Sequence, residues 1–367
     1  MRSSMSENET NTTDIEKEYH SYIMRKILLI VVFFILCIIS VAVSLTINDL
    51  GLKPLEAFEY LIKHLTGGEF ETTTEKRNDF MIWNFYTPRV VMAIICGCGL
   101  AICGVLMQSV LANPLADPYT TGVSDGACLG ATVAIVTGFT YASVASEMGI
   151  VVNAFIGALV PALIIIFLSA VVKMTPATTI LVGVALSNVF GGIQTLINYL
   201  ADPESLTAAL RWGIGSFTSV HWNDCRIPFF VTLVGGIISA FLYKKLNLIT
   251  LGENSAKSLG LDVERFKTLC LVMVAIMASS LICFVGIIGF VGLVGPHIVR
   301  MVIGGDNKFV LPASMLIGSF LLLVSDLIAR VIIYPDELRA GLIMSIIGAP
   351  IFLYMIVSRK SNYGSVY

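Results

Sequence analysis

The chain has 367 residues, of which 56% are hydrophobic and only 13% are charged. Soluble globular proteins carry about 25% charged residues, so this composition excludes that class and places most of the chain in a membrane. The formal net charge is −2 and no stretch concentrates Lys and Arg, which excludes a nucleic-acid-binding surface.

The first predicted element is a membrane-spanning helix at 27–47, a stretch of 21 residues without a charge. Residues 1–26 are polar and form a tail before it. A cleaved signal peptide has a shorter apolar stretch and a shorter positive lead, so we expect this helix to remain in the mature protein. Arg25 and Lys26 favour a cytoplasmic start for the helix.

Nine further apolar stretches follow, each of a length that suits a span of about 20 residues. They lie at 90–111, 121–140, 150–172, 178–200, 228–246, 268–285, 286–303, 310–334 and 341–357. The mixed connection at 48–88 is predicted to be external, with one short amphipathic helix near 55–65. We therefore predict an all-α membrane protein whose ten transmembrane helices occupy 27–360, with tails at 1–26 and 361–367.

Ten spans place both ends of the chain on the same side of the membrane. If that side is cytoplasmic, 14 of the 23 Lys and Arg residues face the cytoplasm, with the clearest group at 244–267. Cytoplasmic loops carry an excess of Lys and Arg. Both termini are therefore predicted to be cytoplasmic.

Three glycines, Gly122, Gly126 and Gly130, recur at a four-residue spacing and line one face of a predicted helix. Such a stripe lets a neighbouring backbone approach closely. Simple close packing and a place beside a conduction path both remain open as interpretations.

A second glycine series has a three-residue spacing and ends at a proline and a histidine. It consists of Gly286, Gly289, Gly292 and Gly295, followed by Pro296 and His297. This spacing does not follow the 3.6-residue helical period, so it predicts a tight or broken helical hairpin. Irregular backbone at membrane depth is tolerated only where protein or a water-filled cavity covers it. Close packing is again the alternative, and His297 is interpreted as a structural residue.

The segment 113–118, NPLADP, separates the second and third predicted spans. Pro114 and Pro118 cannot both lie inside one straight helix without removing hydrogen bonds. Together with Asn113 and Asp117 they predict a re-entrant or cytoplasmic turn that is structurally fixed and lies beside a conduction path.

Charged residues inside spans are the strongest functional signal in a membrane sequence. Asp326 and Arg330 lie four residues apart in the ninth predicted span, so they can pair on one helix face. A structural pair and a cation presented to an outside partner both remain open. Arg89, just after Pro88 at the outer start of the second span, is a second candidate, although a lone interfacial Arg is usually an anchor.

The longest polar connection between spans on the predicted cytoplasmic side is 250–267, TLGENSAKSLGLDVERFK. Gly252 and Gly260 bracket a short run of helix-forming residues, and Asp262 is placed to cap the next helix. Two short helices joined at a glycine are typical of a peg that docks into another protein. The phosphate-binding pattern GxxxxGK[ST] is excluded, because Leu251 and Ala256 occupy both glycine positions.

The sequence contains no catalytic or metal-binding pattern. Its four histidines share no ligand spacing, and no Ser or Cys has a recognisable base partner. Seven of the eight cysteines lie in apolar stretches, where a small buried hydrophobic role is typical. We therefore expect no enzymatic activity and no bound metal.

Six motifs occur together in one order along the chain. They are TPR at 87–89, NPLADP with GVSDGA at 113–127, LGENSAKSLGL at 251–261, GFVGLVGPHIVR at 289–300, DLIAR at 326–330 and IGAP at 347–350. Together they resemble the iron-siderophore and vitamin B12 (FecCD-type) permease family, the membrane subunits of type II ABC importers. The resemblance covers about 27–360, and the joint order is far more specific than any single motif.

The resemblance implies a permease of the bacterial cell membrane that pairs with a second permease, identical or different, around a central translocation path. Two cytoplasmic ATPase subunits would bind ATP and magnesium, an extracytoplasmic binding protein would deliver the substrate, and this chain would bind no cofactor. The family segment that docks into the ATPase corresponds here to Leu251, Gly252, Glu253, Ala256, Leu259 and Gly260. Family arginines that receive acidic residues of the binding protein correspond to Arg89 and Arg330.

The candidates for helix breaks along the path are Asn113, Pro114, Asp117, Gly122, Gly289, Gly292, Pro296 and His297. Two positions depart from the family pattern. Tyr86 stands where the family often has the first Arg of Arg-x-Pro-Arg, so one cationic contact is missing, and Gly295 replaces an aliphatic residue before Pro296.

A ferric siderophore is the first choice of substrate, followed by haem and then a corrinoid. The alternative function is an ion-coupled secondary transporter that uses Asp326 and Arg330 as an ion relay.

Overall fold

The computed structural model describes residues 2–47, 52, 54–141, 146–171 and 175–362. Helices build these ranges, which contain no β-strand. Their order is α1 (Arg2–Thr46), α2 (Pro54–Leu65), α3 (Thr73–Met81), the π-helix η1 (Ile82–Tyr86), α4 (Thr87–Val110), the 3₁₀ turn η2 (Pro118–Thr121), α5 (Val123–Thr137), α6 (Ser146–Val171), α7 (Pro176–Leu200), α8 (Pro203–Trp212), α9 (Trp222–Thr250), α10 (Glu253–Ser258), α11 (Val263–Val285), α12 (Val291–Ile303), α13 (Asn307–Val331) and α14 (Ala340–Asn362).

Seven helices in the described part of the chain are long and apolar enough to cross a membrane. These stretches are His20–Thr46, Thr73–Val110, Glu147–Leu168, Ala177–Leu200, Trp222–Thr250, Val263–Val285 and Asn307–Val331. Three shorter apolar helices accompany them, at Val123–Thr137, Val291–Ile303 and Ala340–Tyr354. Each of the apolar stretches predicted from the sequence overlaps one of these helices, which makes the chain an all-helical membrane protein.

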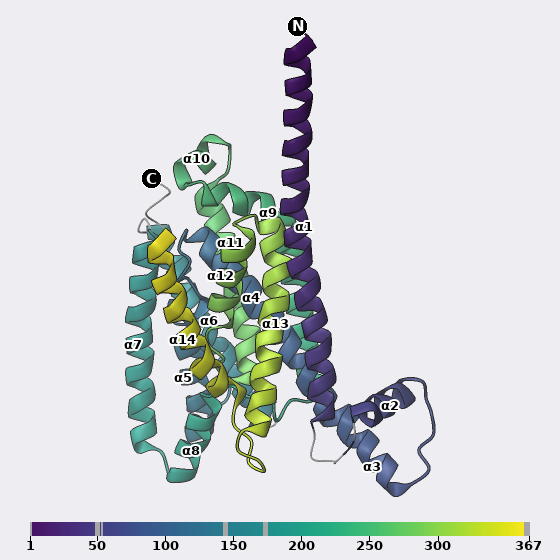
Figure 1. The fold of residues 1–367 in the computed structure, drawn as a ribbon. Helices are drawn as coiled ribbons and strands as arrows, with labels where there is room; N and C mark the ends of the chain where they lie inside the picture. The colour runs from purple at the N-terminus through teal and green to yellow at the C-terminus, as the bar shows by residue number, and fades with distance from the viewer. Residues whose placement is uncertain (1, 48–51, 53, 142–145, 172–174, 363–367) are drawn as a thin grey trace.

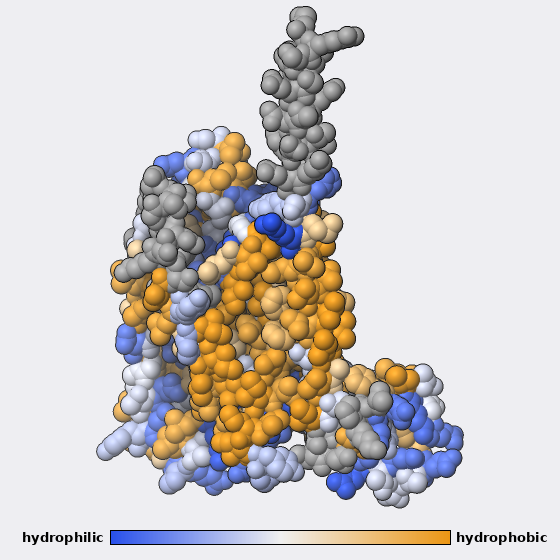
Figure 2. Space-filling model, viewed as in Figure 1, coloured by the Kyte–Doolittle hydropathy of each residue, from blue (hydrophilic) through white to orange (hydrophobic). Residues whose placement is uncertain are grey.

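The two ends of the helical bundle differ in what they carry (Figure 1). The short helix α10, the start of α1 and the end of α14 lie at one end, which we call the α10 end. Helices α2, α3 and α8 lie at the opposite end, which we call the α8 end. Between them, apolar side chains cover the face formed by α1, α13 and α14, while hydrophilic residues gather at both ends (Figure 2). An apolar band of this kind suits contact with the apolar interior of a membrane.

Helices α5 and α12 are shorter than the apolar part of a bilayer. They contain 15 and 13 residues, so at 1.5 Å per residue each spans about 20 Å of a core about 30 Å thick. Gly122 and Gly138, both in the left-handed conformation, bound α5. Residues 286–290 are not helical, so the predicted break lies there, and Pro296 and His297 lie inside α12 without ending it.

Helix α4 is the centre of the bundle, and nearly all of its residues are buried. It packs against α9, α11, α12 and α13. A methyl group added to Gly97 would lie 2.4 Å from the backbone of Ser319 on α13. Helices α5 and α6 meet in the same way, because a methyl group on Gly126 would lie 2.3 Å from the carbonyl oxygen of Gly157. The close approach predicted from the glycine spacing is therefore present at this interface.

The irregular part of α12 lies against α4. Pro296 has no N–H to give to the carbonyl of Gly292 one turn earlier. That carbonyl faces Gly104 of α4, where an added methyl group would lie 1.7 Å from the oxygen. Gln108 donates through its side chain to the neighbouring carbonyl of Leu293 at 3.2 Å. Protein therefore covers the weakened helix, as membrane depth requires.

Outside the spans, the structure confirms the helix expected near 55–65, which is α2. It adds two helices that the sequence analysis treated as connections, α3 and α8. It also continues α1 back to Arg2, so residues assigned to a polar tail extend the first helix.

Gly104→Ala should destabilise the protein by about 2 kcal/mol or more, since overpacking a well-packed interior costs about 1–3 kcal/mol. The new methyl group would meet backbone atoms of Gly292, which cannot rotate away as a side chain can. Thermal unfolding of the purified protein in detergent measures the effect as a lower midpoint.

Gly236→Ala on α9 is the matched control, because its methyl group would meet only the side chain of Ile102 at an ordinary 3.4 Å. Its unfolding midpoint should stay unchanged or rise, since Ala favours a helix over Gly. Equal losses in the two variants would show that close backbone contact is not the cause.

Candidate functional site: a buried charge network, an outer cavity and the α10 segment

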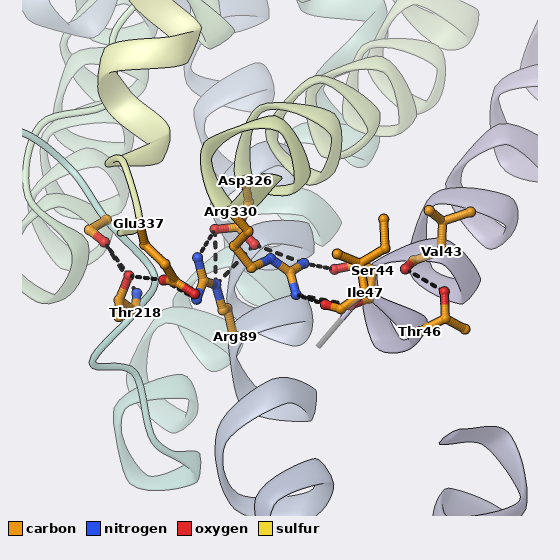
Figure 3. A network of polar contacts seen from close by, with 10 residues as sticks. Val43, Ser44, Thr46, Ile47, Arg89, Thr218, Asp326, Arg330 and Glu337 are labelled. Atoms are coloured by element: carbon orange, nitrogen blue, oxygen red, sulfur yellow. Dashed lines mark hydrogen bonds and ion pairs between the residues drawn. The ribbon is translucent and has the colours of Figure 1, made fainter. Parts of the chain in front are cut away.

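Charged side chains from distant parts of the chain meet where α4 begins and α13 ends (Figure 3). Arg89 donates through Nε to both carboxylate oxygens of Asp326, at 3.0 Å each, and its Nη2 lies 2.9 Å from Oδ1. Arg330, one helical turn beyond Asp326, reaches the same carboxylate through Nη2 at 3.2 Å. The pair expected from the four-residue spacing is present, and Arg89 joins it.

Glu337, in the connection between α13 and α14, completes the charge balance. Its Oε2 accepts from Nη1 of Arg89 at 2.8 Å and from the hydroxyl of Thr218 at 3.2 Å. The side chains of Arg89, Asp326 and Arg330 are only 6%, 2% and 4% exposed. Charges buried this deeply persist only where partners and further hydrogen bonds offset their desolvation. Two guanidiniums and two carboxylates meet that condition.

Arg330 also binds the last turn of α1. Its Nη1 donates to the carbonyls of Ser44 at 2.9 Å and Ile47 at 3.1 Å, and its Nη2 donates to the hydroxyl of Ser44. The last carbonyls of a helix lack partners within the helix, so a cation there is favourable. From the sequence, a structural pair and a cation presented to an outside partner both remained open for Arg330, and the family resemblance implied docking roles for Arg89 and Arg330. The structure places both guanidiniums in the interior.

One polar atom of this network lacks a hydrogen-bond partner. It is the buried Nε of Arg330, from which no described residue accepts a hydrogen bond. Arg330 lines a small depression of ≈ 160 Å³ at the α8 end, together with Tyr86, Tyr334 and Glu337. Tyr86 is the position at which the sequence departs from Arg-x-Pro-Arg. A carboxylate that entered the depression would lie beside the guanidinium of Arg330.

A larger cavity of ≈ 1510 Å³ opens beside the network at the α8 end. Its walls come from α5, α6, α8, the end of α11 and the connections on either side of them. Thr218 and Glu337 belong both to the wall and to the network, so Arg89 holds one of the carboxylates of the cavity. We call this space the outer cavity, because it lies at the end of the bundle that the sequence predicts to be external.

The outer cavity was not predicted, because no helix was assigned to the connection between the apolar stretches at 178–200 and 228–246. The signal was present: Asp202, Pro203 and Glu204 are the residues preferred at the first positions of a helix. Asp202 indeed caps α8 by accepting from the N–H groups of Glu204 and Ser205 at 3.0 Å each. This cap fixes the start of the helix that presents Arg211 and Trp212 to the cavity.

The segment 250–267 forms the expected peg at the α10 end (Figure 1). Gly252 and Gly260, with φ of 101° and 86°, take the left-handed conformations that turn the chain on either side of α10. Ala256 is fully buried, whereas Leu251 and Leu259 are 65% and 63% exposed. The peg therefore presents apolar side chains to whatever lies beyond this end.

The peg is held by two anchors. Glu253 at its start pairs with Lys267 of α11, which is buried. Asp262 caps α11 by accepting from the N–H of Arg265 at 3.2 Å, as the sequence analysis expected. These two contacts thus fix the position of the segment that carries the exposed leucines.

A polar cluster links the peg to the body of the protein. Asn247, one turn before α9 ends, donates to Asp306 at 2.9 Å and accepts from the backbone of Asn307 at 2.8 Å. Arg300 of α12 donates to Ser109 of α4 at 2.8 Å and to Asn307 at 3.0 Å. Helices α4, α9, α12 and α13 are therefore joined directly below α10. Nothing in the sequence marks this cluster, because single polar residues at helix ends have no distinctive spacing.

The two predicted irregular segments lie against each other. Asn113 begins a turn by accepting from the N–H of Leu115 at 3.0 Å, and buried Asp117 accepts from that of Tyr119 at 2.8 Å. The hydroxyl of Tyr119 then donates to the carbonyl of Ile288 in the other irregular segment, at 2.8 Å. The structure thus brings together two segments far apart in sequence.

The remaining candidates for helix breaks lie around this contact. Pro114 lies in the turn after α4, Gly122 ends η2 in the left-handed conformation, and Gly289 lies in the irregular segment before α12. Gly292 lies in the first turn of α12, where an added methyl group would lie 3.3 Å from Oδ2 of Asp117.

Asp326→Asn should destabilise the protein by about 3–5 kcal/mol, because it leaves buried guanidiniums without their shared carboxylate. Thermal or denaturant unfolding in detergent measures the loss. Glu337→Gln is the control, since that side chain is 28% exposed and water screens its contribution. Its loss should be about 1 kcal/mol or less; equal losses would show that burial does not govern the network.

Comparisons with known proteins agree over most of the chain. Residues 35–358 match the FecCD transport family. The chain is 36% identical to the hemin transport system permease of Yersinia pestis, over 78% of this chain and 86% of that protein. It is 32% identical to the Fe(3+)-citrate import system permease of Bacillus subtilis, over 90% of this chain and 95% of that protein.

A solved structure has a similar fold. It is a metal-chelate type ABC transporter in an inward-facing conformation, with a TM-score of 0.77 and 27% sequence identity. The similarity covers 90% of this chain and 98% of that one.

Proposed function

This chain belongs to the FecCD transport family, and we propose that it carries a ferric siderophore through the cell membrane as the permease of an ABC importer. A permease of this kind is not itself catalytic and binds no cofactor, since partner ATPase subunits hydrolyse the ATP. The family match over 35–358 is the observation that carries the proposal. Relatives named for Fe(3+)-citrate and hemin support an iron chelate, with haem as the second substrate and a corrinoid as the third.

The proposed topology has ten transmembrane helices in the type II arrangement, with both termini in the cytoplasm. It is supported by the position of α10, the start of α1 and the end of α14 at one end of the bundle. That end carries Lys244, Lys245, Lys257 and Lys267, and basic residues are enriched on the cytoplasmic side. The outer cavity then opens to the outside.

A second permease, identical or different, is proposed to pack against α7. Along this helix Leu181 and Leu196 are 68% and 61% exposed. An added methyl group on Gly191 or Gly192 would meet nothing within 4 Å. Adjacent glycines with open space beside them give a lipid-facing helix no advantage, but they let another helix approach closely. The translocation path is proposed to run between the two permeases, beside the irregular segments joined by Tyr119 and Ile288.

Coupling to the two ATPase subunits is proposed to occur through the peg. Leu251, Gly252, Glu253, Ala256, Leu259 and Gly260 form it, and the exposed leucines would enter a cleft of the ATPase. Closure of the ATPases on ATP would move α10, and the cluster around Asn247 and Asn307 would pass this movement to α4, α9, α12 and α13. The path would then open alternately to the two sides, with ATP selecting between states that already exist.

Docking of the substrate-binding protein is proposed to involve Arg89 and Arg330, with Arg330 as the direct contact. An acidic side chain entering the depression beside Tyr86 would lie against the positive charge of the Arg330 guanidinium. Arg89 would act through Glu337, which it holds at the rim of both the depression and the outer cavity.

The geometry weighs against the ion-coupled alternative. The carboxylate of Asp326 already accepts from Arg89 and pairs with Arg330, so it has no open position for a transported cation. Vesicle transport separates the two mechanisms. With its ATPase and binding protein, the permease should take up a radiolabelled ferric chelate only when ATP is present. Uptake that ignores ATP and collapses with the proton gradient would contradict the proposal.

Leu259→Asp should abolish this ATP-driven uptake and the co-purification of the ATPase, while the protein still inserts into the membrane. A charge placed at an apolar contact costs its desolvation when the contact forms. Leu65→Asp on α2 is the control, because Leu65 is 66% exposed at the opposite end. Normal uptake by the Leu259 variant would exclude the peg as the coupling element.

Arg330→Lys should weaken binding of the substrate-binding protein about tenfold, since a hydrogen bond to a charged group is worth about 1.5–3 kcal/mol. The variant keeps a positive charge beside Asp326 but lacks the Nε donor. The loss should shrink at high salt, where a charge contact near the surface is screened. Arg226→Lys at the same end should bind as the unaltered protein does, and unchanged affinity in both would refute docking at Arg330.

A further inference from the structure

Two arginines on the wall of the outer cavity take no part in the buried network. Arg211 lies in the last turn of α8, and Arg339 directly precedes α14. Both line the cavity of ≈ 1510 Å³. The sequence analysis singled out neither residue, because they are 128 positions apart in the chain.

The structure holds these arginines side by side. Nη1 of Arg339 donates to the carbonyl of Arg211 at 2.7 Å and to that of Ile214 at 3.2 Å. These bonds use one nitrogen of the Arg339 guanidinium, and the side chain of Arg211 makes no hydrogen bond to a described residue. Most of the donors of both groups thus remain available.

No described carboxylate neutralises either arginine. The ion pairs in the described ranges involve other residues, and Glu337 on the same wall is already engaged by Arg89 and Thr218. Glu204 also lines the cavity but lies outside ion-pair distance of both arginines. Partial burial and the positive charge of Arg211 lower the pKa of the Arg339 guanidinium. Two like charges held together in this way would be relieved by an anion.

The remaining walls indicate what kind of molecule carries that anion. At ≈ 1510 Å³ the cavity exceeds the roughly 300–1,000 Å³ of ordinary small-molecule pockets. Trp212, Phe284 and Ile135 supply aromatic and apolar surface, and Ser216 and Ser219 supply hydroxyl groups. A ligand that fits these walls is large, partly apolar and acidic. Guanidiniums bind carboxylates in a planar, two-point geometry that lysine cannot reproduce.

We propose that Arg211 and Arg339 form a carboxylate-binding pair in the outer cavity and select metal chelates with free acidic groups over uncharged ones. This inference rests on the proposed function and narrows its substrate class. The concave shape favours a small ligand over an acidic side chain of the binding protein, which is the other source of a carboxylate at this end.

The test uses the complete transporter, permease with its ATPase subunits, in lipid nanodiscs. Three probes are titrated: haem and ferric citrate, which carry free carboxylates, and cyanocobalamin, whose peripheral acids are amides. At least one anionic probe should bind more tightly than cyanocobalamin. Arg211→Gln should weaken that binding about tenfold, the effect of losing one charged contact of about 1.4 kcal/mol, and should leave cyanocobalamin unchanged.

Matched variants distinguish the effect of losing a charged contact from the effect of impaired folding. Arg339→Lys keeps a cation but loses the planar guanidinium, so it should weaken the anionic probe less than Arg211→Gln with an unchanged unfolding midpoint. Arg226 is an exposed arginine at the same end and lies outside the cavity. Arg226→Gln should therefore leave the dissociation constants of all three probes unchanged. The losses in the cavity variants should fall as salt is added.

Two results would overturn the inference. One is that no anionic probe binds better than cyanocobalamin, or that Arg211→Gln leaves every dissociation constant unchanged. The other is that Arg211→Gln weakens the binding protein and not the probes, which would assign the pair to protein docking. Neither result contradicts the proposed function. That function is contradicted instead if the unaltered complex shows no ATP-dependent uptake of any chelate.

Discussion

The carboxylate of Asp326 is the constraint on which the α8 end depends. It lies between the guanidiniums of Arg89 and Arg330, where almost no water reaches any of the three groups. A buried charge without a partner costs several kcal/mol, so none of these residues can move alone. Because Arg330 also holds the end of α1 and Arg89 also holds Glu337, one carboxylate fixes the meeting of α1, α4, α13 and the connection before α14.

Helices α4 and α13 are clamped at both ends. Arg89 and Asp326 join them at the α8 end, and Ser109 and Asn307 join them at the α10 end through the shared guanidinium of Arg300. Between the clamps the two backbones touch at glycines, because lipid gives helices no hydrophobic reason to associate and close packing must supply it. The pair is therefore held at one end by the polar cluster near the peg and at the other end by the charge network beside the outer cavity.

Local sequence signals predicted the helices and turns better than they predicted the contacts between them. The apolar stretches located the spanning helices, and Gly252, Gly260 and Asp262 located the peg, because turns and caps depend only on residues close in the chain. The same rules would have located α8 and α3, whose caps at Asp202 and Thr72 are ordinary ones. The role of Arg89 and Arg330 was harder to predict, since the local sequence around an arginine near a helix end is the same whether the side chain faces water or a buried carboxylate.

By itself the sequence determined that this is a membrane protein, which segments form its apolar helices, and which family it resembles. These properties follow from composition and from short motifs, which need no knowledge of neighbours. Only the tertiary structure decided that Arg89 and Arg330 share Asp326, that the irregular segments meet at Tyr119 and Ile288, and that Arg211 lies beside Arg339. Each of these contacts joins residues far apart in the chain, and helix packing, rather than any local preference, brings them within bonding distance.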